Sequence, residues 1–394
     1  MTHSTALRMT LSEGKKIIII GGGFGGLSAV DILCKSGLNF DISLIDKKGT
    51  ADFLPTLPDC IGRGINPEYL TYKIADLANK IRFKFVKDEV GSIDLDKKEI
   101  LTKTRRFNYD YLIVACGSET NFYGNNNIME YAFKLDDSGD AKRIAEALRK
   151  REYDNYIIGG GGYTGVEVAT NLRLFLTKNK KSGKIIIIEH TSSILGPLPE
   201  WMKNYVSVNF KRLNVDVFVN SSIEKIENGR VYVSGGRVFN KAMVIWAAGV
   251  KTSGFIQDLK VEKNPQGRIK VDEYLRLNES CFVIGDTAYF SYKKAYLRMA
   301  VQFAIAQGSC VAINIIKNVK GCELKKYRPT DFGYIIPMAN NRSCGRVFGI
   351  NLRGFLPTML HFMMCIYRSY GIKNKFGILN GLINGDGSRK RTVP

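Results

Sequence analysis

The chain has 394 residues, of which 45% are hydrophobic and 24% charged, as in a globular protein of two or three domains. This composition excludes a disordered chain, a collagen and a small disulfide scaffold. Three histidines and eight scattered cysteines, none in a CxxC pair, indicate no metal site and a reducing, cytoplasmic setting. The net charge of +21 favours an acidic partner, either anionic lipid or nucleic acid.

The first predicted element is a buried parallel strand, Ile17–Ile20, which runs into a glycine-rich turn and a helix. Gly21, Gly23 and Gly26 have the GxGxxG spacing, which allows a tight turn, a close approach to a pyrophosphate and close helix packing. The helix N-terminus would bind the phosphates. The next strand ends at Asp46, where a carboxylate accepts hydrogen bonds from a ribose hydroxyl. We therefore expect a dinucleotide-binding fold here; the alternative is a purely structural glycine turn.

The same pattern recurs in the middle of the chain. Gly160, Gly162 and Gly165 follow a predicted strand and open a helix, and the next strand ends at Glu189. Glu189 would hold a free 2′-hydroxyl and repel a 2′-phosphate, so we expect NADH rather than NADPH, although lysines lie nearby at 178, 180 and 181. Two such folds predict one resident flavin and one exchangeable nicotinamide nucleotide. The alternative is that one fold is degenerate and empty.

Three further predicted strands end in small residues or an acid. These residues are Ala115 and Gly117, then Ala248 and Gly249, then Gly285 and Asp286. The first two strand ends are expected where the chain passes between domains close to a cofactor. At the third, glycine permits close backbone approach and the carboxylate can accept a ribityl hydroxyl. Each alone could be an ordinary strand end, and it is their order along the chain that supports a shared function.

The C-terminal region predicts two short apolar helices edged by cations. Residues 355–367 carry no formal charge, and a second apolar group, residues 376–383, follows Lys373 and Lys375. A spanning helix needs about 20 residues, so neither crosses a membrane. We expect the pair to lie in the interface of an anionic membrane; the alternatives are a helix packed on the core and a dimer seam. Residues 386–394 are expected to form a disordered basic tail.

The order of these motifs along the chain resembles that of the flavoproteins with two dinucleotide folds. More narrowly, the chain resembles the type II NADH dehydrogenases, which are NADH:quinone oxidoreductases. The narrow indicators are Ala115–Phe122, Gly165-Val-Glu167, Trp246–Val250 and Gly285-Asp286, within a match from about residue 15 to 384. The resemblance implies an α/β fold with two Rossmann-like dinucleotide-binding domains and C-terminal amphipathic membrane-docking helices. It also implies FAD in the first fold, with Gly285 and Asp286 at the ribityl chain, and NADH in the second.

The resemblance further implies roles for two side chains. Glu167 lies near the nicotinamide in the family, although a first-turn carboxylate favoured by the helix dipole is an equal alternative. Gln302, at a helix start expected over Val301–Ala304, borders the flavin and quinone pocket together with Phe53–Pro55. The family's second glutamine of this motif falls at Ala306 here, and Gln307 follows one step later. This departure lies on the quinone side.

The resemblance thus implies an enzyme that passes a hydride from NADH to FAD and two electrons on to a membrane quinone, without proton pumping. It would be a peripheral protein on the cytoplasmic face of the cell membrane, and a homodimer is common in the family. Sulfide:quinone oxidoreductases and other NAD(P)H:acceptor flavoproteins share the architecture, but the former use a mid-chain cysteine and none lies between Cys116 and Cys281. An NADH-sensing nucleic-acid-binding protein is more remote, because no helix-turn-helix or finger spacing is present, and no nucleic-acid partner is expected.

We expect four segments. Residues 1–125 and 255–328 would form a discontinuous FAD-binding domain, and 126–254 an inserted NADH-binding domain. Residues 329–394 would form a C-terminal membrane-association segment with a short β region.

Overall fold

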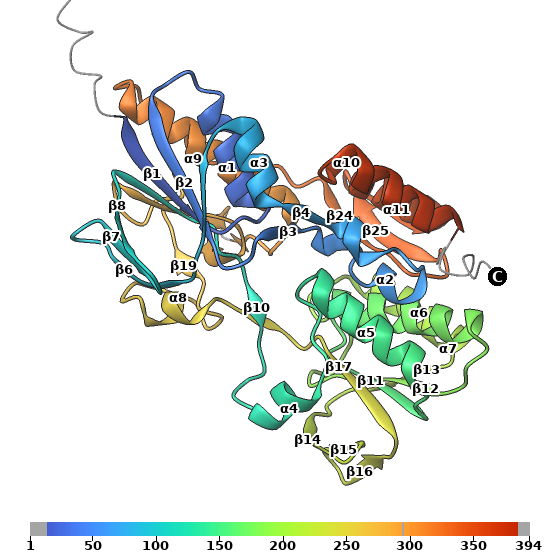
Figure 1. Cartoon of the computed structure of the whole chain (residues 1–394). Coiled ribbons are helices and arrows are strands. Elements are labelled where there is room, and N and C mark those ends of the chain that lie inside the picture. The colour runs from blue at the N-terminus through green and yellow to red at the C-terminus, as the bar shows by residue number, and fades with distance from the viewer. Residues whose placement is uncertain (1–13, 294, 385–394) are drawn as a thin grey trace, which may run out of the picture. The chain divides into compact units, whose positions relative to one another are not determined.

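The computed structural model describes residues 14–293 and 295–384, and the basic tail expected from residue 386 lies outside them. The chain forms two compact units, each assembled from separate segments (Figure 1). Unit 1 comprises Met1–Ala51, Lys73–Glu119 and Val250–Asp331, and unit 2 comprises Asp52–Tyr72, Thr120–Gly249 and Phe332–Pro394. Relative to the expected segments, the division points fall a few residues away, and two pieces, 52–72 and the C-terminal region, group with the middle of the chain.

Unit 1 is built on a five-stranded parallel sheet in the order β20-β9-β1-β2-β5. Its strands are β1 (Lys15–Ile20), β2 (Phe40–Asp46), β5 (Lys84–Lys87), β9 (Tyr111–Val114) and β20 (Cys281–Val283). The four isoleucines of β1 are buried, as expected for a central parallel strand with both faces covered. The helices α1 (Phe24–Cys34) and α9 (Val301–Val319) pack against each other (Figure 1), and α9 begins where the sequence predicted it.

Smaller elements complete unit 1. A three-stranded antiparallel sheet contains β6 (Val90–Asp94), β7 (Glu99–Thr102) and β8 (Arg106–Asn108). The remaining elements are α3 (Ile74–Ile81), α8 (Gly254–Asp258), η4 (Gly285–Thr287) and the strand pairs β19 (Ile269–Lys270) with β21 (Ala288–Tyr289) and β22 (Ser291–Tyr292) with β23 (Ala295–Tyr296).

Unit 2 repeats the parallel architecture, with four strands in the order β13-β12-β11-β17. These are β11 (Asn155–Gly159), β12 (Lys184–Ile188), β13 (Val215–Phe218) and β17 (Ala242–Trp246), and the helices of this part are α4 (Asn126–Tyr131), α5 (Ser138–Lys150), α6 (Tyr163–Lys178) and α7 (Glu200–Arg212). An antiparallel sheet of β14 (Ile223–Glu227), β15 (Arg230–Val233) and β16 (Arg237–Phe239) follows β13 in the chain. The predicted α/β class with two Rossmann-like folds is confirmed.

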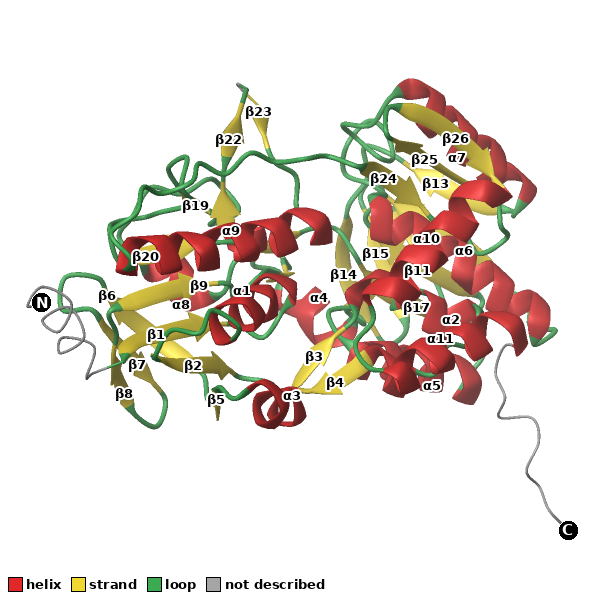
Figure 2. Ribbon diagram, turned by 90° about the horizontal axis from the view of Figure 1, so that it is seen from above, coloured by secondary structure: helices red, strands yellow, loops and turns green. Residues whose placement is uncertain are grey.

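The C-terminal part of unit 2 contains the expected short β region and helix pair. Its antiparallel sheet consists of β24 (Gly333–Ile336), β25 (Ser343–Val347) and β26 (Ile350–Gly354), and it leads into α10 (Phe355–Arg368) and α11 (Ile372–Asn384) (Figure 2). Among residues 14–293 and 295–384, no helix has both the length and the hydropathy that a membrane crossing requires.

The segment 52–72 is held in unit 2 by close backbone packing. It contains η2 (Leu54–Thr56), α2 (Asp59–Gly62) and η3 (Pro67–Leu70). A Cβ on Gly62 would lie 2.2 Å from the carbonyl oxygen of Asn171 on α6, and a Cβ on Gly377 of α11 would meet the ring of Tyr69 at 2.1 Å. Two short strand pairs, β3 (Thr50–Asp52) with β4 (Thr71–Lys73) and β10 (Glu119–Thr120) with β18 (Val250–Lys251), occur where the chain passes from one unit to the other.

Candidate functional site

The glycine turn after β1 has no space for side chains at its two ends. Gly21 has φ +105°, and a Cβ there would lie 2.3 Å from the carbonyl oxygen of Ala115 at the end of β9. A Cβ on Gly26 would lie 2.0 Å from the Gly21 carbonyl oxygen. Because both positions exclude a side chain, the turn brings α1 tightly onto the strand edge, as a dinucleotide fold requires.

Gly23 has the opposite environment. It is exposed, it precedes the first residue of α1 in extended conformation, and a Cβ there would meet no atom within 4 Å. The first turn of a helix presents backbone N–H groups and the positive end of the helix dipole, both of which attract phosphate. The open space over Gly23 therefore fits the pyrophosphate of a dinucleotide.

Asp46 ends β2 beside this turn. Its Oδ2 accepts a hydrogen bond from the Gly22 N–H at 2.7 Å and its Oδ1 accepts one from the Lys48 N–H at 2.6 Å. Burial raises the pKa of Asp46, and these two bonds oppose the shift. A carboxylate oxygen can accept more than one hydrogen bond, so each retains capacity for a ribose hydroxyl.

The remaining unit 1 residues lie at the same edge of the sheet. Ala115 and Gly117 follow β9, and Gly285 follows β20, which pairs in parallel with β9. The Asp286 carboxylate accepts a hydrogen bond from Ser118 Oγ at 3.0 Å, and burial raises its pKa. The carboxyl ends of β1, β2, β9 and β20 thus gather the predicted FAD residues at one edge, where open α/β sheets bind ligands.

Gln307 positions the Gly285 turn, and sequence reasoning gave it no role. It is 2% exposed, and its Oε1 accepts a hydrogen bond from the Gly285 N–H at 2.7 Å. One residue along a helix turns the side chain by about 100°, so Gln307 faces a different neighbour from that of a glutamine at 306. Its offset from the expected glutamine position was the signal available in the sequence.

Unit 2 contains a second turn of the same construction. Gly160 has φ +104°, and its Cβ would lie 2.5 Å from the Ala248 Cα at the end of β17. A Cβ on Gly165 would lie 2.0 Å from the Gly160 carbonyl oxygen, whereas one on Gly162, before the first residue of α6, would meet nothing within 4 Å. The same three-glycine pattern therefore forms a second open helix N-terminus that fits a pyrophosphate.

Glu189 corresponds to Asp46. Its Oε2 accepts a hydrogen bond from the Gly161 N–H at 2.7 Å, and its Oε1 accepts bonds from the N–H and the hydroxyl of Thr191, both at 2.7 Å. The carboxylate is therefore fixed at the carboxyl end of β12, next to the glycine turn. A negative charge held there disfavours a second phosphate on the ribose.

The second crossing segment also lies beside this turn. Ala248 accepts a hydrogen bond at its carbonyl oxygen from Tyr123 Oη at 3.1 Å. Gly249 leaves no space for a side chain, because its Cβ would lie 2.2 Å from that same hydroxyl oxygen. The predicted residues of unit 2, including Glu167 on the second turn of α6, are thus gathered at one edge of its sheet.

Gln302 lies in unit 1, near the start of α9. Its Nε2 donates a hydrogen bond to Asp331 Oδ1 at 3.0 Å, and Arg298 donates to the same carboxylate, with Nη2 2.8 Å from Oδ1. The Asp331 carboxylate therefore holds both the Gln302 amide and the Arg298 guanidinium.

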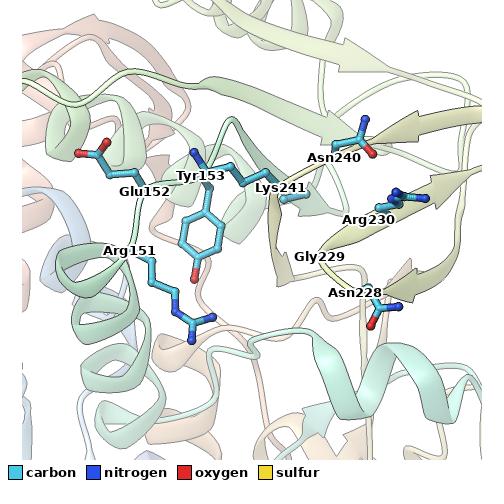
Figure 3. A pocket seen from close by; sticks show the side chains of 9 residues that line it. Arg151, Glu152, Tyr153, Asn228, Gly229, Arg230, Asn240 and Lys241 are labelled. Carbon is cyan, nitrogen blue, oxygen red and sulfur yellow. The ribbon is translucent and has the colours of Figure 1, made fainter.

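Unit 2 also contains a pocket of about 690 Å³, and Figure 3 shows the side chains that line it. Residues 151–153 precede β11, residues 228–230 lead from β14 into the start of β15, and residues 240–242 lead into β17. It therefore opens at the amino ends of β11 and β17, away from Gly160 and Glu189. Lys241 is paired with Asp154 at 3.1 Å. This pocket is not the nucleotide site, because such sheets bind ligands at their carboxyl edge.

A family model described as pyridine nucleotide-disulphide oxidoreductase matches residues 15–308. The chain belongs to this family. This oxidoreductase is 27% identical over 372 residues to the type II NADH:quinone oxidoreductase of Staphylococcus aureus, covering 87% of the chain and 92% of that relative. It is 26% identical over 377 residues to the protein of the same name from Staphylococcus haemolyticus, with the same coverage. The resemblance to type II NADH dehydrogenases is confirmed.

Solved structures agree in fold with this pyridine nucleotide-disulphide oxidoreductase. NDH2 from Plasmodium falciparum, solved in complex with NADH, has a TM-score of 0.83 at 19% identity and covers 96% of this chain and 100% of that one. The sulfide:quinone oxidoreductase of Aquifex aeolicus has a TM-score of 0.77 at 18% identity, with 93% of each chain covered. At these sequence identities, the structural similarity supports the fold alone.

Proposed function

We propose that this protein oxidises NADH through bound FAD and passes two electrons to a quinone, as a non-pumping NADH:quinone oxidoreductase. The observation that carries the proposal is the presence of two complete dinucleotide cradles in one chain. Each cradle has an open helix N-terminus and, at the end of its second strand, a carboxylate that is fixed by hydrogen bonds. In each, the end of a third strand packs against the glycine turn. The names of the curated relatives agree with this activity.

FAD is assigned to unit 1. Gly21, Gly23 and Gly26 would admit its pyrophosphate, Asp46 its ribose, and the residues around Ala115, Gly117, Gly285 and Asp286 its ribityl chain and ring. When bound, the flavin accepts a hydride from the nicotinamide and passes two electrons to the acceptor. The chain contributes binding and orientation, and no covalent catalyst is needed.

NADH is assigned to unit 2. Gly160, Gly162 and Gly165 would admit the pyrophosphate, and Ala248 and Gly249 would line the approach to it. Glu189 would accept the ribose hydroxyls and exclude NADPH. Glu167 and Gln302 are the two side chains assigned to the chemistry, Glu167 beside the nicotinamide and Gln302 beside the quinone.

The acceptor is dissolved in lipid, which gives the C-terminal helices a function. Their exposed apolar side chains are Phe355, Leu356, Met359, Met363, Met364 and Tyr367 on α10 and Ile372, Phe376, Leu379 and Ile383 on α11. Their other faces are buried in unit 2, through Phe362 and Cys365 on α10 and Ile378 on α11. An amphipathic pair with lysines at 373 and 375 suits the surface of an anionic bilayer. We therefore infer a peripheral protein on the cytoplasmic face of the cell membrane.

The test is the colour of the protein and its response to NADH. Purified protein should be yellow and should bleach anaerobically when NADH is added, and a short-chain quinone should restore the colour. Colourless active protein, or a flavin that stays oxidised with NADH, would overturn the assignment.

A sulfide:quinone oxidoreductase is the main rival because the Aquifex aeolicus structure shares the fold. All eight cysteines are free thiols, and Cys116 lies against hydroxyl groups, with its Sγ 3.5 Å from Thr287 Oγ1 and 3.8 Å from Ser253 Oγ. Such surroundings do not supply the disulfide that sulfide oxidation uses. In the same anaerobic assay, sulfide should leave the flavin oxidised where NADH bleaches it.

A further inference from the structure

Two acidic side chains of unit 2 lie near the point where α2 crosses α6. Gly62 and Asn171 bring the helix backbones into direct contact, and Asp59 and Glu167 lie about one helical turn before these residues. Asn171 contacts both, because its side chain hydrogen-bonds the Asp59 carboxylate and its Nδ2 donates to the Glu167 carbonyl oxygen at 3.0 Å. The charge of Asp59 reaches Glu167 and, together with burial, raises the pKa of Glu167 well above its ordinary value.

Among the residues the structure describes, one guanidinium forms an ion pair with these two carboxyls, and it binds Asp59. Arg63 Nε lies 3.1 Å from Asp59 Oδ1, and both side chains are nearly buried, at 12% and 5% exposure. Arg63 is fixed by Asn341 Oδ1 at 2.8 Å and by the Phe362 ring, 4.8 Å from its Cζ. Within the described part of the chain, the Glu167 carboxyl has no hydrogen-bond or ion-pair partner.

Helix α10 closes the other side of the pair with neutral groups. His361 Nε2 lies 3.4 Å from Cys365 Sγ. Burial and the charge of Arg63 lower the pKa of His361 to about 4, whereas burial and the charges of Asp59 and Glu167 raise the pKa of the Cys365 thiol. The other titratable groups facing this site are the Cys60 thiol, whose pKa burial and Asp59 raise, and Arg368, whose charge acts on Cys365.

Two adjacent buried carboxyls rarely ionise together, and the one that has a cation ionises first. We propose that Asp59 is a positioning residue that keeps Glu167 protonated at neutral pH, so that the pair holds one proton. The pKa of Asp59 is raised to about 6, by burial against the effect of Arg63, so it is ionised at pH 7. A minor part of Glu167 remains exposed, so its proton can leave towards a ligand.

The use of this proton depends on the proposed function. Reduction of a quinone to a quinol takes up two electrons and two protons, and the hydride of NADH supplies both electrons and one proton. The second proton would start from Glu167, beside the nicotinamide, and reach the quinone through water: the Glu167 O–H bond breaks, an O–H bond forms on the quinol oxygen, and the carboxylate then takes a proton from water.

Infrared spectroscopy of the resting protein tests the pair without NADH or quinone. A protonated carboxyl has a C=O stretch that a carboxylate lacks, so the wild-type minus Glu167→Gln difference spectrum should contain that band at neutral pH. Its absence would overturn the proposal. Because no electron transfer is involved, this outcome is independent of whether the protein reduces quinones.

Two variants on α2 test the role of the neighbours. In Asp59→Asn the Arg63 charge is left facing Glu167, so the titration midpoint of the Glu167 band should fall by at least about one pH unit. Asp59→Glu should restore it. If Asp59→Asn does not fold, Arg63→Gln is the variant to measure. Because Asp59 then lacks its cation, it should also hold a proton at neutral pH, and a second carboxyl band should appear.

A surface substitution in the same unit is the matched control. Asp154 is an exposed aspartate paired with Lys241, and Asp154→Asn should leave the Glu167 midpoint unchanged. An unshifted midpoint in Asp59→Asn, or a single unchanged band in Arg63→Gln, would show that the two carboxyls do not share a proton. With a short-chain quinone, the alkaline limb of the rate profile should move to lower pH in Asp59→Asn together with the infrared midpoint.

Discussion

Gly162 and Gly165 lie three residues apart on the same turn but have different constraints. At Gly162 an added side chain meets no protein atom within 4 Å, so Gly162→Val should fold and keep its flavin. The new methyl groups would occupy the space assigned to the NADH pyrophosphate. We expect KM for NADH to rise at least about tenfold, equivalent to about 1.4 kcal/mol of binding. Steady-state kinetics with a saturating quinone measures this.

Gly165→Ala is the informative comparison. Its Cβ would overlap the Gly160 carbonyl oxygen, which is backbone and cannot move aside, so this smaller substitution should reduce the yield of folded protein. If Gly162→Val kept the wild-type KM for NADH, the pyrophosphate would not lie over this turn.

Glu189 determines which nicotinamide nucleotide the second cradle accepts. Glu189→Ala removes the charge that would repel a 2′-phosphate, and it also removes the hydrogen bond to the Gly161 N–H. We expect the ratio of kcat/KM for NADPH to that for NADH to rise at least about tenfold. Glu200→Ala, on the exposed start of α7, should leave the ratio unchanged. An unaltered ratio in Glu189→Ala would mean that the ribose binds elsewhere.

Asp331 holds both Gln302 and Arg298, so it should affect the acceptor half of the reaction. Asp331→Asn loses the charge that fixes the Gln302 amide, and we expect KM for the quinone to rise about three- to tenfold, at most about 1.4 kcal/mol. Anaerobic bleaching by NADH, followed by stopped flow, should keep its wild-type rate. Asp258→Asn, an exposed residue of α8 in the same unit, is the control. A slower bleaching step in Asp331→Asn would contradict this separation.

Whole elements differ in how far the sequence could predict them. The two cradles could be predicted because each is local: strand, glycine turn and helix follow within about twenty residues, and GxGxxG spacing fixes their geometry. The carboxyl pair could not, because α2, α6 and α10 are separated by more than a hundred residues each and meet only in the folded chain. The role of Gln307 could not be predicted because this glutamine lies one residue after the expected position on the helix and therefore faces a different neighbour.

The helix pair α10–α11 has an outer face that could be predicted and an inner face that could not. Apolar spacing showed a hydrophobic stripe, but not that Phe362, Cys365 and Ile378 fill the core of unit 2. Deleting the pair would therefore uncover that core. Point substitutions on the outer face test docking more cleanly.

Membrane docking should be lost when charge is placed on that outer face. Met363 and Phe376 are 59% and 64% exposed, so Met363→Glu with Phe376→Glu should fold normally. Two carboxylates in the interface remove apolar contact and repel anionic lipid, and we expect binding to anionic vesicles to fall at least about tenfold. Sedimentation with vesicles measures this. Phe348→Glu, at an exposed phenylalanine outside the two helices, is the control; equal losses in both variants would contradict docking through α10 and α11.

At the scale of the whole molecule, the buried titratable groups of unit 2 link stability to pH with opposite signs. The native pKa of His361 is lowered to about 4, so the unfolded chain binds more protons between about pH 4 and 6.5 and stability rises with pH there. The pKa of Asp59 is raised to about 6, so the native state binds more protons between about pH 4 and 6 and stability falls. These two contributions largely offset each other below pH 6.

Above about pH 6, Glu167 should therefore dominate the pH dependence of unfolding among these three groups. Its pKa is raised by burial and by Asp59, so the native state keeps a proton that the unfolded chain releases, and stability falls as pH rises. Glu167→Gln removes this dependence, and its stability relative to wild type should grow as pH rises from about 6, by at most about 1.4 kcal/mol per pH unit. Thermal unfolding of the holoprotein across that range measures the difference, with Glu200→Gln as the exposed control. Parallel curves for Glu167→Gln and wild type would mean that Glu167 ionises in the native state as it does in the unfolded chain.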